Sequence, residues 1–296
     1  FMRFRKRIMH VVNRVGDPAY GLSLLASVLA LMEREQFTSP RLIALRRELE
    51  THGVPPSRLI ARLNRLMEIL DSRDSVPVRV IGPPLMWTTQ LAFAIEAWRK
   101  QNGPMVRRWI EAVGEIEALS SLASHAYEHP ADPFPELAAS GRVFEAEAIA
   151  HPLLDERKAV RNDVRLGEDI SVLVVSGSNM SGKSTLLRTV GVNAVLAMAG
   201  APVRARRLRM SPLTVEPLLF LLDELLHGTN SPDRRIGGEA VVRTLVERGA
   251  FGLLTTHDLA LADIAEVLAP HVANVHFEDR LENGNILFDY ELRPGI

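Results

Sequence analysis

The sequence contains no cysteine among its 296 residues. A chain without thiols can form neither a disulfide framework nor a site in which thiolates bind a metal or attack a substrate. This composition suits a reducing compartment, and we expect a cytoplasmic protein. Long apolar runs are also missing, because the most apolar stretches, 22–32 and 85–98, are too short or too interrupted by polar residues to cross ~30 Å of hydrocarbon. We therefore expect no membrane segment in this chain.

The chain has no excess of either charge, with 35 lysines and arginines against 36 aspartates and glutamates and a formal net charge of -1. The whole molecule therefore has no electrostatic bias toward nucleic acid or an anionic membrane, and such a partner needs a local patch. Hydrophobic residues make up 47% of the sequence, enough to fill a globular core. The chain begins with Phe1 and stops at Ile296, so we expect it to be part of a longer protein.

The first part of the chain, residues 1–132, reads as an all-α domain. Its segments repeat one pattern, in which a capping residue and a proline precede apolar residues at spacings of three and four, as in Asp17-Pro18 and Ser39-Pro40. This pattern is typical of amphipathic helices that pack into a core. Helices are expected over about 18–32, 40–53, 59–70, 87–100 and 104–127.

Three prolines between His129 and Pro135 break the helical pattern and mark a domain boundary at about 132/133. Beyond it, short apolar runs alternate with helical segments, which predicts a mainly parallel sheet because parallel strands need helical crossovers. Asn283-Gly284 between two alternating runs predicts a C-terminal antiparallel hairpin. Strands are expected over 171–176, 218–222, 252–255, 272–277 and 286–292, and helices from 183 and over about 235–248 and 259–267.

Residues 177–184 fit the motif G-x-x-x-x-G-K-[ST] between a β-rich run and a helix, which is the context that the motif requires. Glycines allow backbone N–H groups to turn toward phosphate oxygens at the positive end of the helix, while Lys183 reaches the β- and γ-phosphates and Ser184 offers its hydroxyl to Mg²⁺. The segment predicts a P-loop that binds a nucleoside triphosphate. Its residues are Gly177, Ser178, Asn179, Met180, Ser181, Gly182, Lys183 and Ser184.

The apolar run 218–222 ends in two carboxylates, Asp223 and Glu224, as expected of a buried central strand that delivers acids to the carboxyl edge of the sheet. Beside a P-loop, Asp223 would hold the Mg²⁺ shell and Glu224 would orient and deprotonate the attacking water. The sequence therefore predicts a Mg²⁺-dependent ATPase.

A third strand, 252–255, leads to His257 at the same edge. A histidine there can sense the γ-phosphate through a hydrogen bond, but a histidine at a strand end is more often a structural residue. The polar loop 227–233 is compatible with a simple turn and equally with a surface that faces a second subunit.

Taken together, these segments resemble the ATPase domain of the MutS family of DNA mismatch-repair proteins. The resemblance covers about residues 140–296 and is most specific at the Asn179-Met180 pair inside the loop. The preceding helices are compatible with part of the core or lever domain of that family. The matching segments are GSNMSGKST at 177–185, LDE at 222–224, GTNS at 228–231, TTHD at 255–258, HPLL at 151–154 and VANVH at 272–276.

The resemblance implies an α/β P-loop NTPase of the ABC type that works as a homodimer and encloses each nucleotide between two subunits. It implies that residues 177–185, including Thr185, bind ATP, that Ser184 and Asp223 bind the metal, and that Glu224 and Lys183 serve catalysis. It further implies that His257 is a switch histidine and that Asp233 lies in a loop that reaches across the dimer. Asn162 is expected to border the adenine pocket.

The sequence departs from the family in two respects. The signature segment that separates the P-loop half from the carboxylate strand has no match. In addition, a predicted strand end at 213–215 lies only two residues before the strand that begins at Leu218, whereas a parallel crossover needs a dozen residues or more. We therefore expect residues to be missing near 215/216. A mismatch-reading domain is not evident, so mismatch specificity is not supported.

These observations predict a MutS-like protein that binds and hydrolyses ATP, acting as a dimer on DNA in mismatch repair or recombination-related DNA maintenance. The alternative is a regulatory or scaffold module in which the nucleotide moves a helical lever against a protein partner without any recognition of mismatched DNA. The nearly neutral charge favours the alternative somewhat, and the intact Lys183, Asp223 and Glu224 are common to both.

Overall fold

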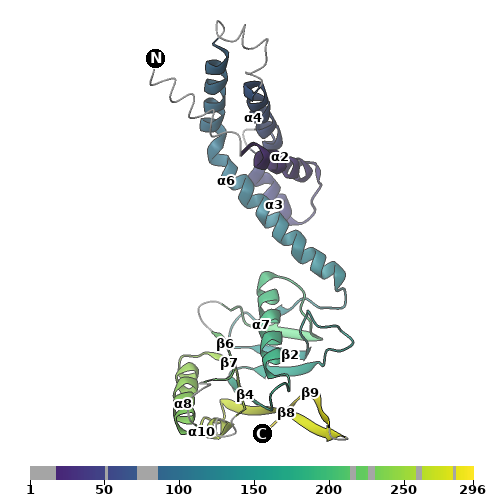
Figure 1. The fold of residues 1–296 in the computed structure, drawn as a ribbon, viewed down its shortest axis with the longest axis vertical. Helices are drawn as coiled ribbons and strands as arrows, with labels where there is room; N and C mark the ends of the chain where they lie inside the picture. Colours follow the sequence, from purple (N-terminus) through teal and green to yellow (C-terminus); the bar gives the residue numbers. More distant parts are fainter. Residues whose placement is uncertain are drawn as a thin grey trace. The chain divides into compact units, whose positions relative to one another are not determined.

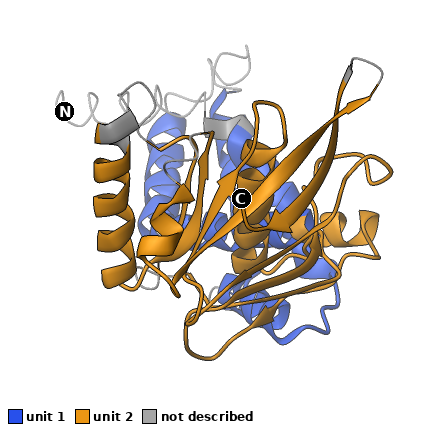
Figure 2. Ribbon diagram, turned by 90° about the horizontal axis from the view of Figure 1, so that it is seen from below, with its two compact units in different colours: residues 1–121 blue, residues 122–296 orange. Residues whose placement is uncertain are grey.

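The computed structural model describes residues 18–50, 53–71, 86–213, 218–225, 231–257, 262–282 and 285–296. The chain divides into two compact units, Phe1–Ser121 and Leu122–Ile296 (Figure 2). The division lies inside a long helix, upstream of the proline-rich segment at which the sequence predicts a boundary. Within the described residues, every helix is too short or too polar to cross a membrane.

The first unit is helical, as the spacing of apolar residues predicts (Figure 1). It contains α2 (Pro18–Arg34), α3 (Pro40–Leu49), α4 (Pro56–Asp71) and most of α6 (Trp87–Glu128). Each of the first three helices begins at a proline, whose fixed φ and missing N–H suit the first helical position. The largest side chains buried in its core are Trp109, Leu29, Leu45, Leu49, Ile60 and Leu70.

One prediction for this unit is wrong, because the expected helices 87–100 and 104–127 form the single helix α6 with Pro104 inside it. An internal proline costs about 3 kcal/mol by removing a backbone hydrogen bond and crowding the preceding turn. The burial of side chains before and after Pro104 outweighs that cost. Trp98 and Trp109 belong to one hydrophobic cluster, and Trp109 is completely buried. The Asn102 carboxamide also donates to the Trp98 carbonyl one turn earlier in this helix.

The second unit is mixed α/β and contains a five-stranded sheet in the order β6-β7-β4-β8-β9. Strands β6, β7, β4 and β8 run parallel, and β9 pairs antiparallel with β8, as predicted; Asn283 and Gly284 of the expected turn lie outside the described residues. The strands are β4 (Val172–Ser176), β6 (Leu219–Leu222), β7 (Phe251–Thr256), β8 (Val272–Glu282) and β9 (Asn285–Pro294). The helices are α7 (Lys183–Ala199), α8 (Ser231–Glu247) and α10 (Ile264–Val267), which is shorter than expected over its described residues.

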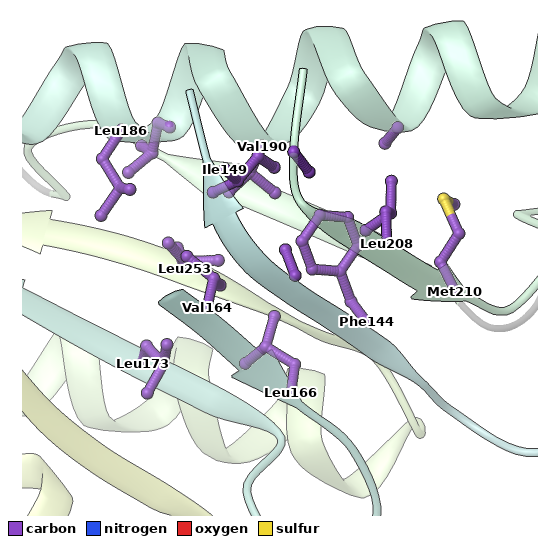
Figure 3. Close-up of a cluster of buried hydrophobic side chains, with 14 of the residues drawn as sticks. Phe144, Ile149, Val164, Leu166, Leu173, Leu186, Val190, Leu208, Met210 and Leu253 are labelled. Atoms are coloured by element: carbon purple, nitrogen blue, oxygen red, sulfur yellow. The ribbon is translucent and has the colours of Figure 1, made fainter. Parts of the chain in front are cut away.

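Strand β4 is buried on both faces, which accounts for its uninterrupted apolar sequence. Leu173 and Val175 face the cluster that contains α7, and Figure 3 shows Leu173 there with Leu186 and Val190 of that helix. Val172 and Val174 belong to a second cluster with residues of α8 and α10 on the opposite face. The sheet is therefore covered on both faces, and the loop between β4 and α7 joins two elements that are fixed in the hydrophobic core.

A second sheet was not predicted. It has the order β1-β5-β2-β3 and consists of β1 (Glu136–Leu137), β2 (Phe144–Ile149), β3 (Asn162–Leu166) and β5 (Arg207–Met210). Its inner face shares the α7 cluster, where Phe144, Leu166 and Met210 are buried (Figure 3).

The connection between β5 and β6 joins strands of two different sheets, whereas the prediction of a missing segment assumed parallel neighbours in one sheet. The strand before the apolar run is β5, which ends at Met210 and pairs with β1 and β2, whereas β6 pairs with β7 in the other sheet. The two strands are not parallel neighbours, so the length of a crossover does not constrain their connection. Residues 214–217 lie outside the described part of the chain, and the missing segment stays a prediction.

The expected central position of the carboxylate strand is wrong, because β6 lies at the end of the five-strand order. Its apolar side chains are explained by the helices that cover the sheet. Phe220 joins the cluster of Val242 on α8, and Leu221 lies so close to Gly191 of α7 that a Cβ there would come within 2.9 Å of its Cδ1. The run is hydrophobic because helices pack on both faces, even though one edge lacks a paired strand among the described residues.

Candidate functional site

The loop 177–182 joins the end of β4 to the start of α7 and depends on two glycines in the left-handed region. Gly177 has a φ of 147°, and a Cβ on it would lie 2.8 Å from Ser181 Oγ. Gly182 has a φ of 106° and is the N-cap of α7. Ser178, Asn179 and Met180 between them are exposed. The backbone of this loop therefore approaches solvent at the positive end of a 17-residue helix, which is an arrangement that favours anions.

Lys183 is the first residue of α7 and is buried, with an exposed fraction of 5%. Its ammonium group donates to the carbonyl oxygens of Gly177 at 2.8 Å and of Ser178 at 2.6 Å. Burial lowers the pKa of Lys183 from its ordinary value, and the negative charges of Glu224 and Asp223 oppose this shift. The lysine is thus held under the loop with its charge near two carboxylates.

Thr255, near the end of β7, bonds to both of the acidic residues that follow β6. Its side chain is completely buried, and its hydroxyl donates to Asp223 Oδ1 at 2.6 Å while accepting from the Glu224 backbone N–H at 2.9 Å. Glu224 has a φ of 50°, a conformation that non-glycine residues adopt rarely. The threonine therefore stabilises the strained turn at Glu224 through a hydrogen bond to each of the two acidic residues.

The Asp223 carboxyl has a pKa below its ordinary value. Partial burial raises this pKa, but hydrogen bonds from the Thr255 and Ser184 hydroxyls and the positive charge of Lys183 outweigh it. Asp223 is consequently held as a carboxylate beside the hydroxyl of Ser184. The Ser184 hydroxyl and the Asp223 carboxylate thus place two oxygen atoms of the kind that bind Mg²⁺ side by side.

His257 follows β7 directly and lies at the same edge, because β7 and β4 are parallel and in register from Val172 to Ser176. Its Nδ1 is 3.8 Å from Glu224 Oε1, and both side chains are partly exposed. Asp233 is exposed in the first turn of α8. The preceding loop residues 226–230 and Asp258 lie outside the described part of the chain.

A cavity of about 580 Å³ lies over the glycine loop, within the range of small-molecule sites. It brings together most of the residues that the sequence predicts to bind a nucleotide, including Asn162. Asp223 and His257 are not part of its lining: Asp223 lies beside Ser184, which lines the cavity, and His257 lies 3.8 Å from Glu224. Gly177, Ser178 and Ser181 are also outside the lining. The predicted residues in its lining are Asn162, Asn179, Met180, Gly182, Lys183, Ser184, Thr185 and Glu224.

Sequence reasoning missed several residues of this site, and two of them shape its geometry. Thr255 was seen only as part of a motif, although a hydroxyl at a buried strand end next to an acidic pair is a readable signal. Tyr290 lines the cavity and lies against the loop, with its Cδ1 3.1 Å from the position that a Cβ on Gly182 would occupy. Tyr290 gives no sequence signal, because only the pairing of β9 with β8 brings it to the loop.

No protein-family model matches the chain. Similarity to curated proteins is clear. The chain is 29% identical to "Endonuclease MutS2" of Thermus thermophilus over 223 residues, which cover 64% of this chain and 28% of that protein. It is 34% identical to "Endonuclease MutS2" of Thermomicrobium roseum over 146 residues, covering 37% and 18% respectively.

A third relative is "DNA mismatch repair protein MutS" of Geobacillus kaustophilus, at 27% identity over 246 residues, covering 70% of this chain and 27% of that protein. The chain thus spans less than a third of the length of each of these three relatives.

Proposed function

We propose that this chain, which is related to the MutS family through its similarity to MutS and MutS2 proteins, is the nucleotide-binding part of an ATPase. The observation that carries the proposal is the position of Lys183, a buried ammonium group that is held under a glycine loop, lines the cavity together with Glu224 and lies near the charge of Asp223. A cation is costly to bury, and this one lies where it can meet an anionic ligand at a helix N-terminus.

In the proposed P-loop, the backbone N–H groups of residues 177–184 bind the phosphates of ATP. Lys183 exchanges its contacts with the Gly177 and Ser178 carbonyls for the β- and γ-phosphate oxygens. Thr185 lies in the same first turn of α7 as Lys183 and extends the lining toward the rest of the nucleotide. Asn162 and Tyr290 also line the cavity, and we propose that they border the base.

The residues present fit a Mg²⁺ ion that is shared with the nucleotide. Mg²⁺ in phosphate-transfer sites takes one or two protein oxygens and completes its shell with phosphate and water. Ser184 and Asp223 supply those two oxygens. The described residues contain no group of three or more His, Cys, Asp or Glu side chains that could hold an ion without substrate. When bound there, Mg²⁺ would neutralise charge on the phosphates.

Hydrolysis requires a base that orients water, and Glu224 is proposed for that role. Its turn is fixed by the hydrogen bond from its N–H to Thr255, so that its side chain faces the cavity while Asp223 faces Ser184. His257, 3.8 Å from Glu224, is proposed to respond to the γ-phosphate. Positioning and charge stabilisation are the main demands of phosphoryl transfer on a protein.

We further propose that the site works between two copies of the chain and that the complete protein acts on DNA. The exposure of Met180 in the loop and of Asp233 in α8 supports this proposal, because both side chains lie where a second copy could contact them. The relatives include proteins named for DNA mismatch repair and for endonuclease activity. Mismatch recognition itself is not proposed for this chain.

Two substitutions test the ATPase proposal. Lys183→Ala is expected to weaken ATP binding at least about a hundredfold, since it removes the buried charge that faces the phosphates. Glu224→Gln keeps the shape of the side chain but removes the base, so it should retain ATP binding within about threefold and lower turnover at least about a hundredfold. Binding is measured by equilibrium titration with Mg²⁺-ATP and turnover by phosphate release.

The control is Glu239→Gln, which neutralises an acid on α8 that pairs with Arg243 and lies outside the cavity. Unchanged turnover in Glu224→Gln would refute its assignment as the base. The same assay with duplex, branched and mismatched DNA separates two functions. ATP turnover that rises when DNA is added, with a stimulation that disappears at high salt, supports action on DNA. ATP turnover that does not change with DNA favours a nucleotide-switched scaffold.

A further inference from the structure

The side chain of Asn162 links the two sheets of the α/β unit. Asn162 is the first residue of β3, in the four-stranded sheet, yet both ends of its carboxamide bond to the backbone of β9 in the five-stranded sheet. Its Nδ2 donates to the Tyr290 carbonyl at 3.1 Å, and its Oδ1 accepts from the Leu292 N–H at 2.7 Å. The amide thus serves β9 as a neighbouring strand would.

The bonded segment of β9 is a bulge. Phe277 pairs with Leu292 and Asp279 pairs with Phe288, so residues 289–291 of β9 lie opposite the single residue 278 of β8. Tyr290, in the middle, has a φ of 56°, which is disfavoured for a residue with a side chain. A strained bulge persists only where surrounding contacts hold it, and Asn162 bonds to it on either side of Glu291.

The bulge places Tyr290 against the glycine loop. The ring Cδ1 of Tyr290 lies 3.1 Å from the Cβ position of Gly182, the residue before Lys183, so the ring rests where only glycine leaves room. Both residues line the cavity, as does Asn162. The chain of contacts runs from Asn162 through the β9 backbone to a ring at the wall of the proposed nucleotide site.

We propose that Asn162 is a positioning residue, whose carboxamide holds the bulge 289–291 and thereby sets the place of Tyr290 in the cavity. This inference rests on the proposed nucleotide binding, and it differs from a direct contact between Asn162 and the base. Within the bulge, Asp289 accepts from the Glu291 N–H and pairs with Arg293 at 2.6 Å, so the segment keeps a local closure of its own when the amide is removed. The bulge should therefore loosen in Asn162 variants while the sheet remains folded.

A double-mutant cycle in the full chain distinguishes the two roles, with Mg²⁺-ATP as the probe. Asn162→Ala and Tyr290→Ala are each expected to raise the Kd for ATP about tenfold. If Asn162 acts through Tyr290, adding Asn162→Ala to Tyr290→Ala raises Kd less than about twofold further. Additive effects of about a hundredfold in the double variant would overturn the proposal. Absence of ATP binding in the parent chain would instead refute the proposed function itself.

Two further measurements keep the result separate from a general loss of stability. Asp163→Ala, at the next position of β3, removes a bond to the Ala148 N–H but none to β9, and should leave Kd within about twofold. Hydrogen exchange at the Leu292 amide should quicken in Asn162→Ala and stay slow in Asn162→Asp, which keeps the acceptor oxygen. Unchanged Leu292 exchange in folded Asn162→Ala would contradict the clamp, whatever the change in Kd.

Discussion

At the scale of single residues, the arrangement around Thr255 is the most sensitive to substitution. The Thr255→Val variant keeps the volume of the side chain but leaves the Glu224 N–H and one Asp223 oxygen without their partner hydroxyl. We expect the free energy of unfolding at pH 7 to fall by about 1–2 kcal/mol, the usual cost of a lost buried hydrogen bond. Chemical denaturation followed by circular dichroism measures the change, and Thr255→Ser, which keeps the hydroxyl, is the control.

The loss of stability in Thr255→Val is expected to depend on pH. The folded-state pKa of Asp223 lies below its ordinary value of 3.8, so its contribution to stability is complete above that value and is lost as pH falls through the folded pKa. Removing the Thr255 hydroxyl raises the folded pKa and shrinks this contribution. The stability difference between parent and variant should therefore narrow below about pH 4. A difference that stays constant from pH 7 to pH 3 would show that the hydroxyl does not act through Asp223.

Site residues whose positions depend on local sequence could be predicted before the structure. Lys183, Asp223 and His257 each follow directly from a strand or a glycine turn, and parallel strands place their carboxyl ends at one edge. Tyr290 was not accessible in this way, because its position results from a bulge in β9 and from a bond to Asn162 across 128 residues of sequence. A bulge re-aims the side chains of a strand, and no local sequence pattern gave its position here.

At the scale of elements, α6 depends on a packing residue close to its proline. Trp109→Ala is expected to lower the stability of the helical unit by about 3–5 kcal/mol, because it leaves a large cavity in the core beside a helix already weakened at Pro104. The neighbouring Ile110→Ala is the matched control: its side chain is 55% exposed, and the expected change is within about 0.5 kcal/mol.

Tryptophan fluorescence measures this effect selectively, because the three tryptophans of the chain, at 87, 98 and 109, all belong to the helical unit, and two remain in the variant. Denaturation followed by fluorescence should shift to lower urea concentration in Trp109→Ala. A shift of similar size in Ile110→Ala would mean that the helix, and not the buried ring, sets the stability.

The elements that sequence reasoning missed have a common physical cause. Strand β2 has the sequence FEAEAI, which alternates correctly, but alanine and glutamate favour helices and are poor strand formers. It becomes a strand because β3 and β5 pair with it on both sides and its Phe144 and Ile149 reach the α7 core. In α6 the same priority of packing over propensity joined two predicted helices into one.

At the scale of the whole molecule, the proposed dimer makes a prediction about mass. A ligand shifts an association equilibrium only by binding the associated form more tightly, so nucleotide should drive self-association only if the second copy contacts the occupied site. In Glu224→Gln the bound ATP persists, and sedimentation velocity with saturating Mg²⁺-ATP should show a doubling of mass that is absent without nucleotide. Lys183→Ala should stay monomeric under both conditions.

Charge at the proposed contact surface provides the control for this experiment. Neutralising Asp233, exposed in the first turn of α8, should weaken the ATP-dependent association about fivefold or more while leaving ATP affinity in the monomer within about twofold, because Asp233 lies outside the cavity lining. Asp233→Asn is the variant, since it keeps the size of the side chain. A chain concentration of about 50 µM lies far above the dissociation constants of specific dimers. If Glu224→Gln with bound ATP sediments as a monomer at that concentration, the proposal of a site shared between two copies is wrong.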